Sequence, residues 1–373
     1  MIIKKEIHKI NQQLKVPFST PDFLDKAYLP SLDGWRAVAI IIVILGHAKL
    51  TVSPTSLYYK FAETFIYAEL GVKIFFVLSG FLITTLLIKE FIKNGKINIS
   101  HFFLKRVLRI FPVLHLYLVV ILILNQIFNL GLNSDHFLGP ILYINNFNIF
   151  SGTWLTGHTW SLAVEEQFYL IWPLLFSLLT KNLWIFCLTI ILAVPLLKVL
   201  WYFRPSYYEP TAGPFLANAD AIFSGALLAI LAFKSFFKKN KKIWTRKGID
   251  LVFISIIFIS VFCVNRGYFG LLFYPCSSTI CNIMICLLFL RTIIGTKTLL
   301  YKFLNKRAMI HLGLISYSLY IWQQLFLVPT DNYAGRFNTI RFPLNIIVAL
   351  IIAYLSYHYF EKYFLKFKGK YIK

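Results

Sequence analysis

The sequence predicts an all-α polytopic membrane protein with about ten transmembrane helices and both termini in the cytoplasm. Of its 373 residues, 58% are hydrophobic and only 14% are charged, and a water-soluble fold of this length cannot bury so much apolar surface. The apolar residues gather in long runs separated by short polar segments. Lysine and arginine gather in alternate connecting segments, which is the pattern that orients membrane proteins.

The apolar runs have about the length of a membrane helix, which is roughly 20 residues. We expect them at 35–51, 67–89, 110–130, 161–180, 183–203, 216–233, 249–265, 271–290, 310–329 and 343–361. Asp33 and Gly34 form a turn or cap before the first run, and Asn94-Gly95 forms a turn after the second. A short re-entrant piece is expected around 141–150, because that stretch is too short and too polar to span.

The charge pattern gives the expected orientation. With ten spans, 29 of the 38 Lys and Arg residues lie on the side that carries both termini, which makes that side cytoplasmic. The expected organisation is a basic N-terminal segment at 1–28, a transmembrane domain at 29–365 and a basic tail at 366–373. No cleavable signal peptide is expected, since about thirty mostly polar residues precede the first apolar run. Although the net charge is +23, nucleic-acid binding is not expected, because the cations are spread over short loops.

The five cysteines indicate neither a metal site nor a disulfide framework. They form no Cys-x-x-Cys pair and lie in or beside apolar runs, at Cys187, Cys263, Cys276, Cys281 and Cys286.

Two ionisable residues on the first helix are the first candidate site. Arg36 and His47 are eleven residues apart, which is about three helical turns, so they share one face. With Arg36 at the membrane edge, His47 lies roughly 16 Å deeper, near the midplane. An imidazole takes and returns a proton near neutral pH, as acyl transfer to a hydroxyl requires. The alternative is a buried histidine satisfied by a neighbouring helix.

A basic cluster opens the third span. Arg106 and Arg109 share a helix face beside Lys105, and guanidinium groups suit phosphate. The alternative is ordinary anchoring of a cytoplasmic helix end.

Two adjacent carboxylates, Glu165 and Glu166, open the fourth span within TWSLAVEEQFYLIWP. They point about 100° apart and therefore serve different roles, such as pairing with a basic group or accepting a proton. The alternative is a structural pair capped by Trp160 and Gln167. In the second span, Ser79 and Gly80 are expected mainly as a packing notch, although a serine nucleophile is possible. Lys73, Asp220 and His115 are expected to be mainly structural.

Four stretches in this order resemble the membrane acyltransferase-3 family: LDGWRAVAIIIVILGHA, GVKIFFVLSGFLI, LKRVLRIFP and TWSLAVEEQFYLIWP. The resemblance extends from about residue 29 to 365. It implies O-acylation of an envelope glycan from cytoplasmic acyl-CoA. It makes His47 and Arg36 the signature pair tied to activity, and it maps the family's basic residues onto Arg106 and Arg109 and its acidic motif onto Glu165 and Glu166. We expect Arg106 and Arg109, with Lys105 beside them, to bind the donor. Residues expected to line the site are Asp33, Ser79, Gly80, Trp160, Ser161 and Tyr169.

The sequence departs from the family in two ways. SYSLYIWQQ has Gln323 where a second histidine is common, which argues against a two-histidine relay. Many relatives also carry a fused extracytoplasmic esterase-like domain, which this sequence lacks, so the chain is expected to act alone or to pass its acyl group to a separate partner.

The expected function is therefore a multi-pass enzyme of the cell (inner) membrane that moves an acyl group, most simply acetyl, from acyl-CoA to a sugar hydroxyl. No permanently bound cofactor is expected. The expected partners are acyl-CoA, a glycan or lipid-linked sugar acceptor and membrane lipids. Two alternatives remain open: a non-catalytic transporter of lipid-linked sugar, and a sensor or assembly protein that keeps the fold without catalysis.

Overall fold

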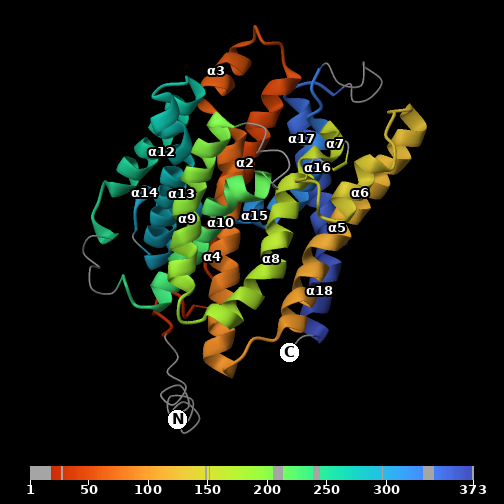
Figure 1. Ribbon diagram of the computed structural model, residues 1–373. Coiled ribbons are helices and arrows are strands. Elements are labelled where there is room, and N and C mark those ends of the chain that lie inside the picture. The colour runs from red at the N-terminus through yellow and green to blue at the C-terminus, as the bar shows by residue number, and fades with distance from the viewer. Residues whose placement is uncertain are drawn as a thin grey trace.

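The computed structural model describes residues 18–26, 28–147, 149–150, 152–204, 213–237, 244–295, 297–330 and 340–371. Every regular element within these ranges is a helix, and the long helices form one bundle (Figure 1). Residues 1–17 and 27 of the expected N-terminal segment lie outside the described residues, as do 238–243 of the most basic loop and 372–373 of the tail.

The helices follow one another with short connections. In chain order they are α2 (Pro30–Ala48), the 3-10 turn η1 (Lys49–Thr51), α3 (Leu57–Phe65), α4 (Ala68–Asn94), α5 (Ile99–Phe128), α6 (Asp135–Ile141), α7 (Trp154–Gly157), α8 (Thr159–Leu179), α9 (Leu183–Phe203), α10 (Gly213–Phe233), α12 (Ile249–Asn265), α13 (Gly270–Ile294), α14 (Leu299–Leu304), α15 (Arg307–Leu314), α16 (Ser316–Phe326), α17 (Leu344–Leu355), the π-helical turn η5 (Ser356–Glu361) and α18 (Lys362–Tyr371).

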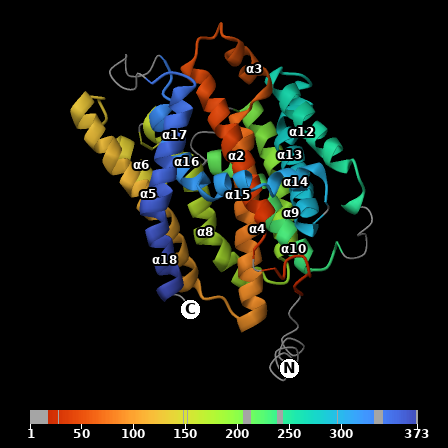
Figure 2. The same cartoon turned by 180° about the vertical axis from the view of Figure 1, so that it is seen from behind.

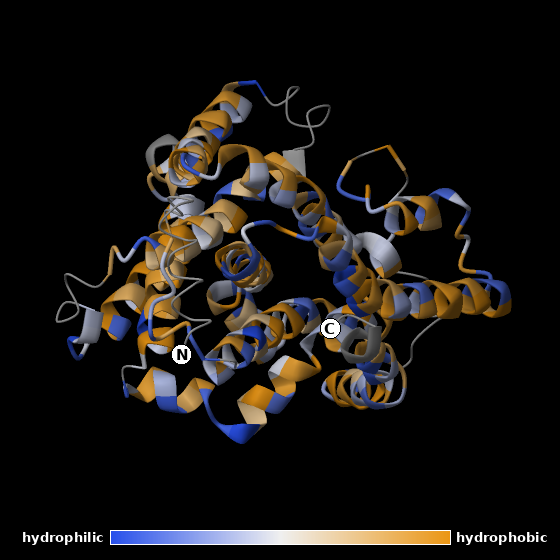
Figure 3. Cartoon of the chain, turned by 90° about the horizontal axis from the view of Figure 1, so that it is seen from below, coloured by the Kyte–Doolittle hydropathy of each residue, from blue (hydrophilic) through white to orange (hydrophobic). Residues whose placement is uncertain are grey.

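The described residues contain eight helical stretches long and apolar enough to cross a membrane, and α12 is an apolar helix of 17 residues. Leu178, Leu196 and Leu251 are more than 70% exposed on the outside of this bundle, where lipid tails solvate such side chains. Viewed from below, hydrophobic residues dominate the outer helices (Figure 3). The all-helical fold is confirmed, and the chain is an integral membrane protein.

The expected span at 310–329 is not one helix. It is divided between α15 and α16, which break at Ile315, and α15 runs across the bundle rather than along it (Figure 2). Close packing on α2 accompanies the break, because a Cβ on Gly313 would lie 1.9 Å from the carbonyl oxygen of Asp33. A Cβ on Gly34 would likewise lie 2.3 Å from the carbonyl oxygen of Leu304, so α14 and α15 together enclose the first turns of α2.

The segment between α5 and α8 also differs from expectation. A short helix, α6, precedes the stretch 141–150, and the described residues of that stretch form turns rather than a re-entrant helix. In α5, the basic residues around 100–110 belong to the same helix as the apolar span. The side chain of Asn98 caps its first turn by accepting a hydrogen bond from the His101 amide at 3.0 Å.

Two glycines bring α4 and α10 together at the centre of the bundle. A Cβ on Gly80 would lie 1.9 Å from the carbonyl oxygen of Ile222, and one on Gly225 would lie 2.0 Å from that of Val77. Small residues permit such close helix packing within membranes. Gly80 was expected mainly as a packing notch, and it does face α10 and set the distance between the two helices.

Candidate functional site

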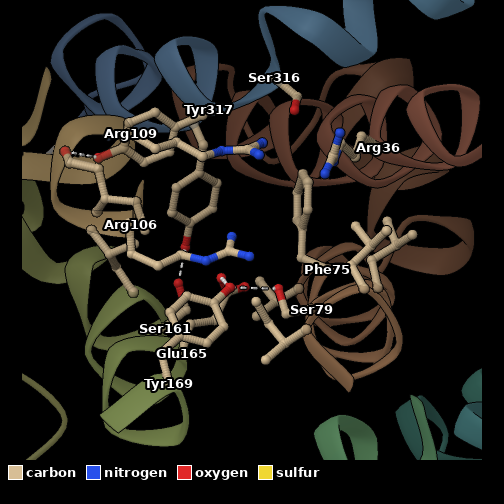
Figure 4. Close-up of a pocket in the computed structure, with 17 residues that line it drawn as sticks. Arg36, Phe75, Ser79, Arg106, Arg109, Ser161, Glu165, Tyr169, Ser316 and Tyr317 are labelled. Atoms are coloured by element: carbon tan, nitrogen blue, oxygen red, sulfur yellow. Dashed lines mark hydrogen bonds between the residues drawn. The ribbon is translucent and has the colours of Figure 1, made fainter. Parts of the chain in front are cut away.

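Several helices enclose a narrow cavity of ≈ 100 Å³ within the bundle. Figure 4 shows the guanidinium groups of Arg36, Arg106 and Arg109 directed into it, opposite the carboxylate of Glu165. Val72 and Ile83 both line the cavity from α4, eleven residues apart, so it extends roughly 16 Å along that helix. We call this cavity the arginine slot. Glu165 is the only carboxylate among the described residues that line it.

Arg36 is held by the residue one turn before it. Its Nη1 lies 2.6 Å from Oδ1 of Asp33, which is 4% exposed. The Tyr28 hydroxyl donates to the other carboxylate oxygen at 2.6 Å. Burial, and secondarily Asp33, raises the pKa of Tyr28 to about 12, so the hydroxyl remains a donor at neutral pH. Arg36 lines the arginine slot inside the bundle, and α4 continues well past the start of α2 (Figures 1 and 2).

Arg106 packs between two aromatic rings. Its guanidinium carbon lies 5.2 Å from the centre of the Tyr169 ring and 5.5 Å from that of Phe102, within the range of cation–π attraction. Its Nε is buried without a hydrogen-bond partner among the described residues. Lys105 is not among the residues lining the slot. Its assignment to the donor site is not supported by this geometry, because adjacent helical residues point about 100° apart.

The two adjacent glutamates, like Lys105 and Arg106, point to different places, and only Glu165 lines the slot. The Tyr169 hydroxyl lies 2.8 Å from Oε2 of Glu165 and 3.0 Å from the Ser79 hydroxyl, and all three residues line the slot. Glu166 does not line it, and its Oε1 is buried without a hydrogen-bond partner among the described residues. Glu165 is therefore the glutamate placed to interact with a ligand in the slot.

His47 lies outside the slot, near the other end of α2. Its Nδ1 is 2.9 Å from Oε1 of Gln323, and its ring meets the edge of Trp154 at 5.4 Å between centroids. An amide oxygen only accepts hydrogen bonds, so His47 carries its proton on Nδ1 and leaves the lone pair of Nε2 free. The expected shared face does not bring Arg36 and His47 to one cavity.

A second histidine, His158, lies beside His47 and its partner Gln323, and the sequence did not indicate it as a candidate. His158 is 3% exposed, its Nδ1 lies 3.0 Å from Oε1 of Gln324, and its buried Nε2 has no hydrogen-bond partner among the described residues. Consecutive glutamines of α16 thus hold His47 and His158. His158 directly precedes the TWSL motif, but sequence spacing does not relate it to a glutamine 166 residues away.

Tyr320 connects the slot with this histidine pair. Its hydroxyl donates to the carbonyl oxygen of His158 at 3.0 Å and lies 2.5 Å from the Ser161 hydroxyl, and Tyr320 and Ser161 both line the slot. Trp160, which was expected beside them, lines a different cavity.

Residues 29–358 match the acyltransferase 3 family model, whose description is "Acyltransferase domain". The chain belongs to this acyltransferase family. The match confirms the resemblance carried by the four sequence motifs, and membership of the family implies an acyl donor.

Two bacterial relatives are similar over most of the chain. The O-acetyltransferase OatA of Staphylococcus aureus is 29% identical over 369 residues, which covers 90% of this chain and 57% of the relative. The peptidoglycan O-acetyltransferase OatA of Listeria monocytogenes is 27% identical over 388 residues, covering 92% of this chain and 58% of the relative. The chain thus spans somewhat more than half the length of these relatives. No solved structure matches the chain.

The glutamine contacts predict the histidine tautomers. In ¹⁵N-histidine NMR spectra of the purified protein, His47 should show the Nδ1–H tautomer, because Gln323 accepts that proton. In Gln323→Leu, His47 should shift towards Nε2–H, the form that free neutral imidazole prefers, while His158 is unchanged. Gln324→Leu is the matched control, because Gln324 contacts His158, and it should leave the His47 tautomer unchanged. A wild-type His47 with its proton on Nε2 would contradict this assignment.

Proposed function

We propose that this chain is a membrane O-acyltransferase that moves an acetyl group from acyl-CoA to a sugar hydroxyl of a cell-envelope glycan. The observation that carries the proposal is the convergence of three arginines on a narrow slot whose other end adjoins a histidine pair. Family membership supports acyl transfer. The names of the two relatives, an O-acetyltransferase and a peptidoglycan O-acetyltransferase, support acetyl as the group and a glycan as the acceptor.

The arginine slot is the proposed donor site. CoA carries its negative charge on phosphates, and buried guanidinium groups bind phosphate through charge-assisted hydrogen bonds. Arg106 and Arg109 line the slot from α5 and Arg36 lines it from α2, with only one carboxylate among its described lining residues. A cavity of ≈ 100 Å³ is too small for a whole CoA molecule. It accommodates part of a slender pantetheine arm, with the nucleotide held at the arginine end.

The histidine pair is the proposed reaction site. Eleven residues of α2 separate Arg36 from His47, a rise of roughly 16 Å that is comparable to an extended pantetheine arm. Nε2 of His47 removes the proton from the sugar hydroxyl as its oxygen attacks the thioester carbonyl carbon. The carbon–sulfur bond then breaks, and the CoA thiolate takes the proton from the imidazolium. In a two-step alternative, His47 carries the acetyl group briefly before the sugar receives it.

The other acidic and basic groups support this chemistry. Asp33 holds Arg36, which orients the donor or stabilises the oxyanion that forms at the carbonyl oxygen. Glu165, hydrogen-bonded by Tyr169, limits the positive charge of the slot and orients the ligand there. Glu166 lies outside the slot and has no direct contact with the donor in this proposal.

The proposed topology has ten passes and two cytoplasmic termini, with residues 29–365 as one catalytic domain between the basic segments 1–28 and 366–373. Ser19 bonds the backbone of Phe233 at the end of α10, and the end of α18 lies at the same end of the bundle (Figure 1). The backbone amide of Thr330 bonds the carbonyl oxygen of Leu50, which brings the far ends of α2 and α16 together. In this topology, α15 and α16 together make the ninth pass across the membrane, which neither helix makes alone.

Replacing both slot arginines of α5 tests the donor site. Arg106→Gln with Arg109→Gln should weaken acetyl-CoA binding by tenfold or more, because each lost charge-assisted contact is worth about 1.5–3 kcal/mol. Calorimetry on the purified protein measures this. Lys105→Gln is the matched control, since it removes one charge beside the slot without altering its lining. Unchanged affinity in the double variant would leave these arginines as helix anchors.

Loss of His47 tests catalysis. His47→Gln keeps hydrogen-bonding capacity but removes the base, and should lower acetyl transfer per folded molecule by about 10²–10⁴-fold. His115→Gln is the control, because His115 bonds the carbonyl oxygen of Phe111 in its own helix, at 2.8 Å, and does not line the arginine slot. Retention of more than about a tenth of wild-type transfer would exclude His47 as the base.

Reporter fusions test the topology. Fusions after Asn146 and Thr330 should report an external location, and fusions after Gly95 and Lys181 a cytoplasmic one. The reason is that the proposed passes carry the chain across the membrane between these positions. A cytoplasmic signal after Thr330 would show that α15 and α16 do not complete a pass.

A further inference from the structure

A second and much larger cavity, of ≈ 1150 Å³, lies beside the arginine slot. Val72 lines both cavities, and on α8 Trp160 faces the larger one while Ser161 faces the slot. A wall one side chain thick therefore separates the two. The helices line the larger cavity mainly near one end, with Glu69 at the start of α4, Trp201 at the end of α9 and Asn218 near the start of α10. This is the end that the proposed topology makes external.

The walls combine flat aromatic rings with neutral polar groups. Trp160 and Trp201 line the cavity, and aromatic faces of this kind cover the C–H faces of sugar rings. The Ser278 hydroxyl faces the same cavity, and it is buried without a hydrogen-bond partner among the described residues. A buried hydroxyl without a partner is costly, and a ligand hydroxyl would satisfy it.

Two lysines give the cavity its charge. Lys73 and Lys198 both line it from within membrane helices, where an ionisable group is expensive and therefore a candidate for function. Lys73 has no carboxylate oxygen within 4.0 Å among the described residues, and its ammonium lies 5.9 Å from the centre of the Tyr67 ring. Glu69 is the only carboxylate among the described lining residues, and it accepts the Tyr67 hydroxyl at 2.7 Å.

Lys198 is only loosely paired. Its ammonium lies 4.0 Å from Oδ2 of Asp220, and the same oxygen accepts the Thr279 hydroxyl at 2.7 Å. Two ammonium groups thus face a cavity with one lining carboxylate, which already has a partner. An anionic ligand would give Lys73 the close partner that it lacks among the described residues and would give Lys198 a nearer one than Asp220.

We propose that the larger cavity binds an anionic saccharide, with Lys73 and Lys198 holding its phosphate or carboxylate group and the tryptophans covering a sugar ring. This inference rests on the proposed function, in which it identifies the acceptor class. The thin wall at Val72 and Ser161 brings the sugar close to the histidine pair, since Ser161 contacts Tyr320 and Tyr320 bonds the backbone of His158.

Saturation-transfer NMR on the full chain in zwitterionic nanodiscs tests the proposal, with N-acetylglucosamine 1-phosphate, glucuronic acid and neutral N-acetylglucosamine as probes. At least one anionic sugar should bind tenfold or more tightly than the neutral one. Preference for the phosphate or for the carboxylate probe identifies the anion, and either supports the inference. Equal binding of anionic and neutral sugars would overturn it. Inorganic phosphate that competes as well as the sugar phosphate would overturn the saccharide part.

The lysine variants complete the test. Lys73→Met, alone and with Lys198→Met, should remove most of the preference for the anionic sugar and leave neutral-sugar binding and acetyl-CoA binding unchanged. Lys181→Met on an exposed loop is the control. If the double variant does not fold, the preference of Lys73→Met alone for the anionic sugar tests the inference. Retained preference in a folded Lys73→Met variant would overturn the inference. A lysine-dependent preference in a protein that transfers no acetyl group would instead support the site and refute the proposed function.

Discussion

The placement of cations inside an apolar bundle is the constraint on which the rest of this structure depends. A guanidinium group within a membrane needs a partner, because its loss of hydration is otherwise uncompensated. Asp33 provides one for Arg36, and the ring of Tyr169 contacts Arg106. Both arginine contacts depend on close helix packing. Gly313 lies against the backbone of Asp33, the partner of Arg36. Gly80 lets α10 approach α4, and the neighbouring Ser79 bonds Tyr169, which contacts Arg106. The slot is thus a consequence of how the charges are accommodated.

The sequence predicts the helices better than the site, for a physical reason. The length of an apolar run determines where a membrane helix begins and ends, so α9, α10 and α12 lie within a few residues of the predicted bounds. The α15–α16 break escaped prediction because an apolar run does not reveal that Gly313 must meet another backbone. Spacing along one helix correctly separates Glu165 from Glu166, but it cannot bring His158 to Gln324. Contacts between distant segments decide which polar residues share a cavity.

Two cavities divided by a thin wall suit a reaction between substrates that enter from opposite sides. The arginine slot is lined at one end by Arg106 and Ile83, and the larger cavity is lined mainly from the other end of the bundle. In the proposed mechanism, only the reacting atoms need to meet, at the wall formed by Val72 and Ser161. Excluding water protects a thioester from hydrolysis and strengthens the electrostatic interactions around the reacting carbonyl.

The glutamine at position 323 bears on the alternative of a fold that has lost catalysis. The resemblance leads us to expect a histidine there, which would either orient His47 or exchange a proton with it. Gln323 keeps the first role, since its amide oxygen accepts the Nδ1 proton of His47 at 2.9 Å, but it cannot titrate. The second ionisable ring is present in space all the same, because the next residue, Gln324, holds His158 beside the same cluster. His158, directly before α8, therefore places a second imidazole beside this cluster. In the proposed mechanism, His47 keeps the fixed orientation and the available Nε2 lone pair that a general base needs.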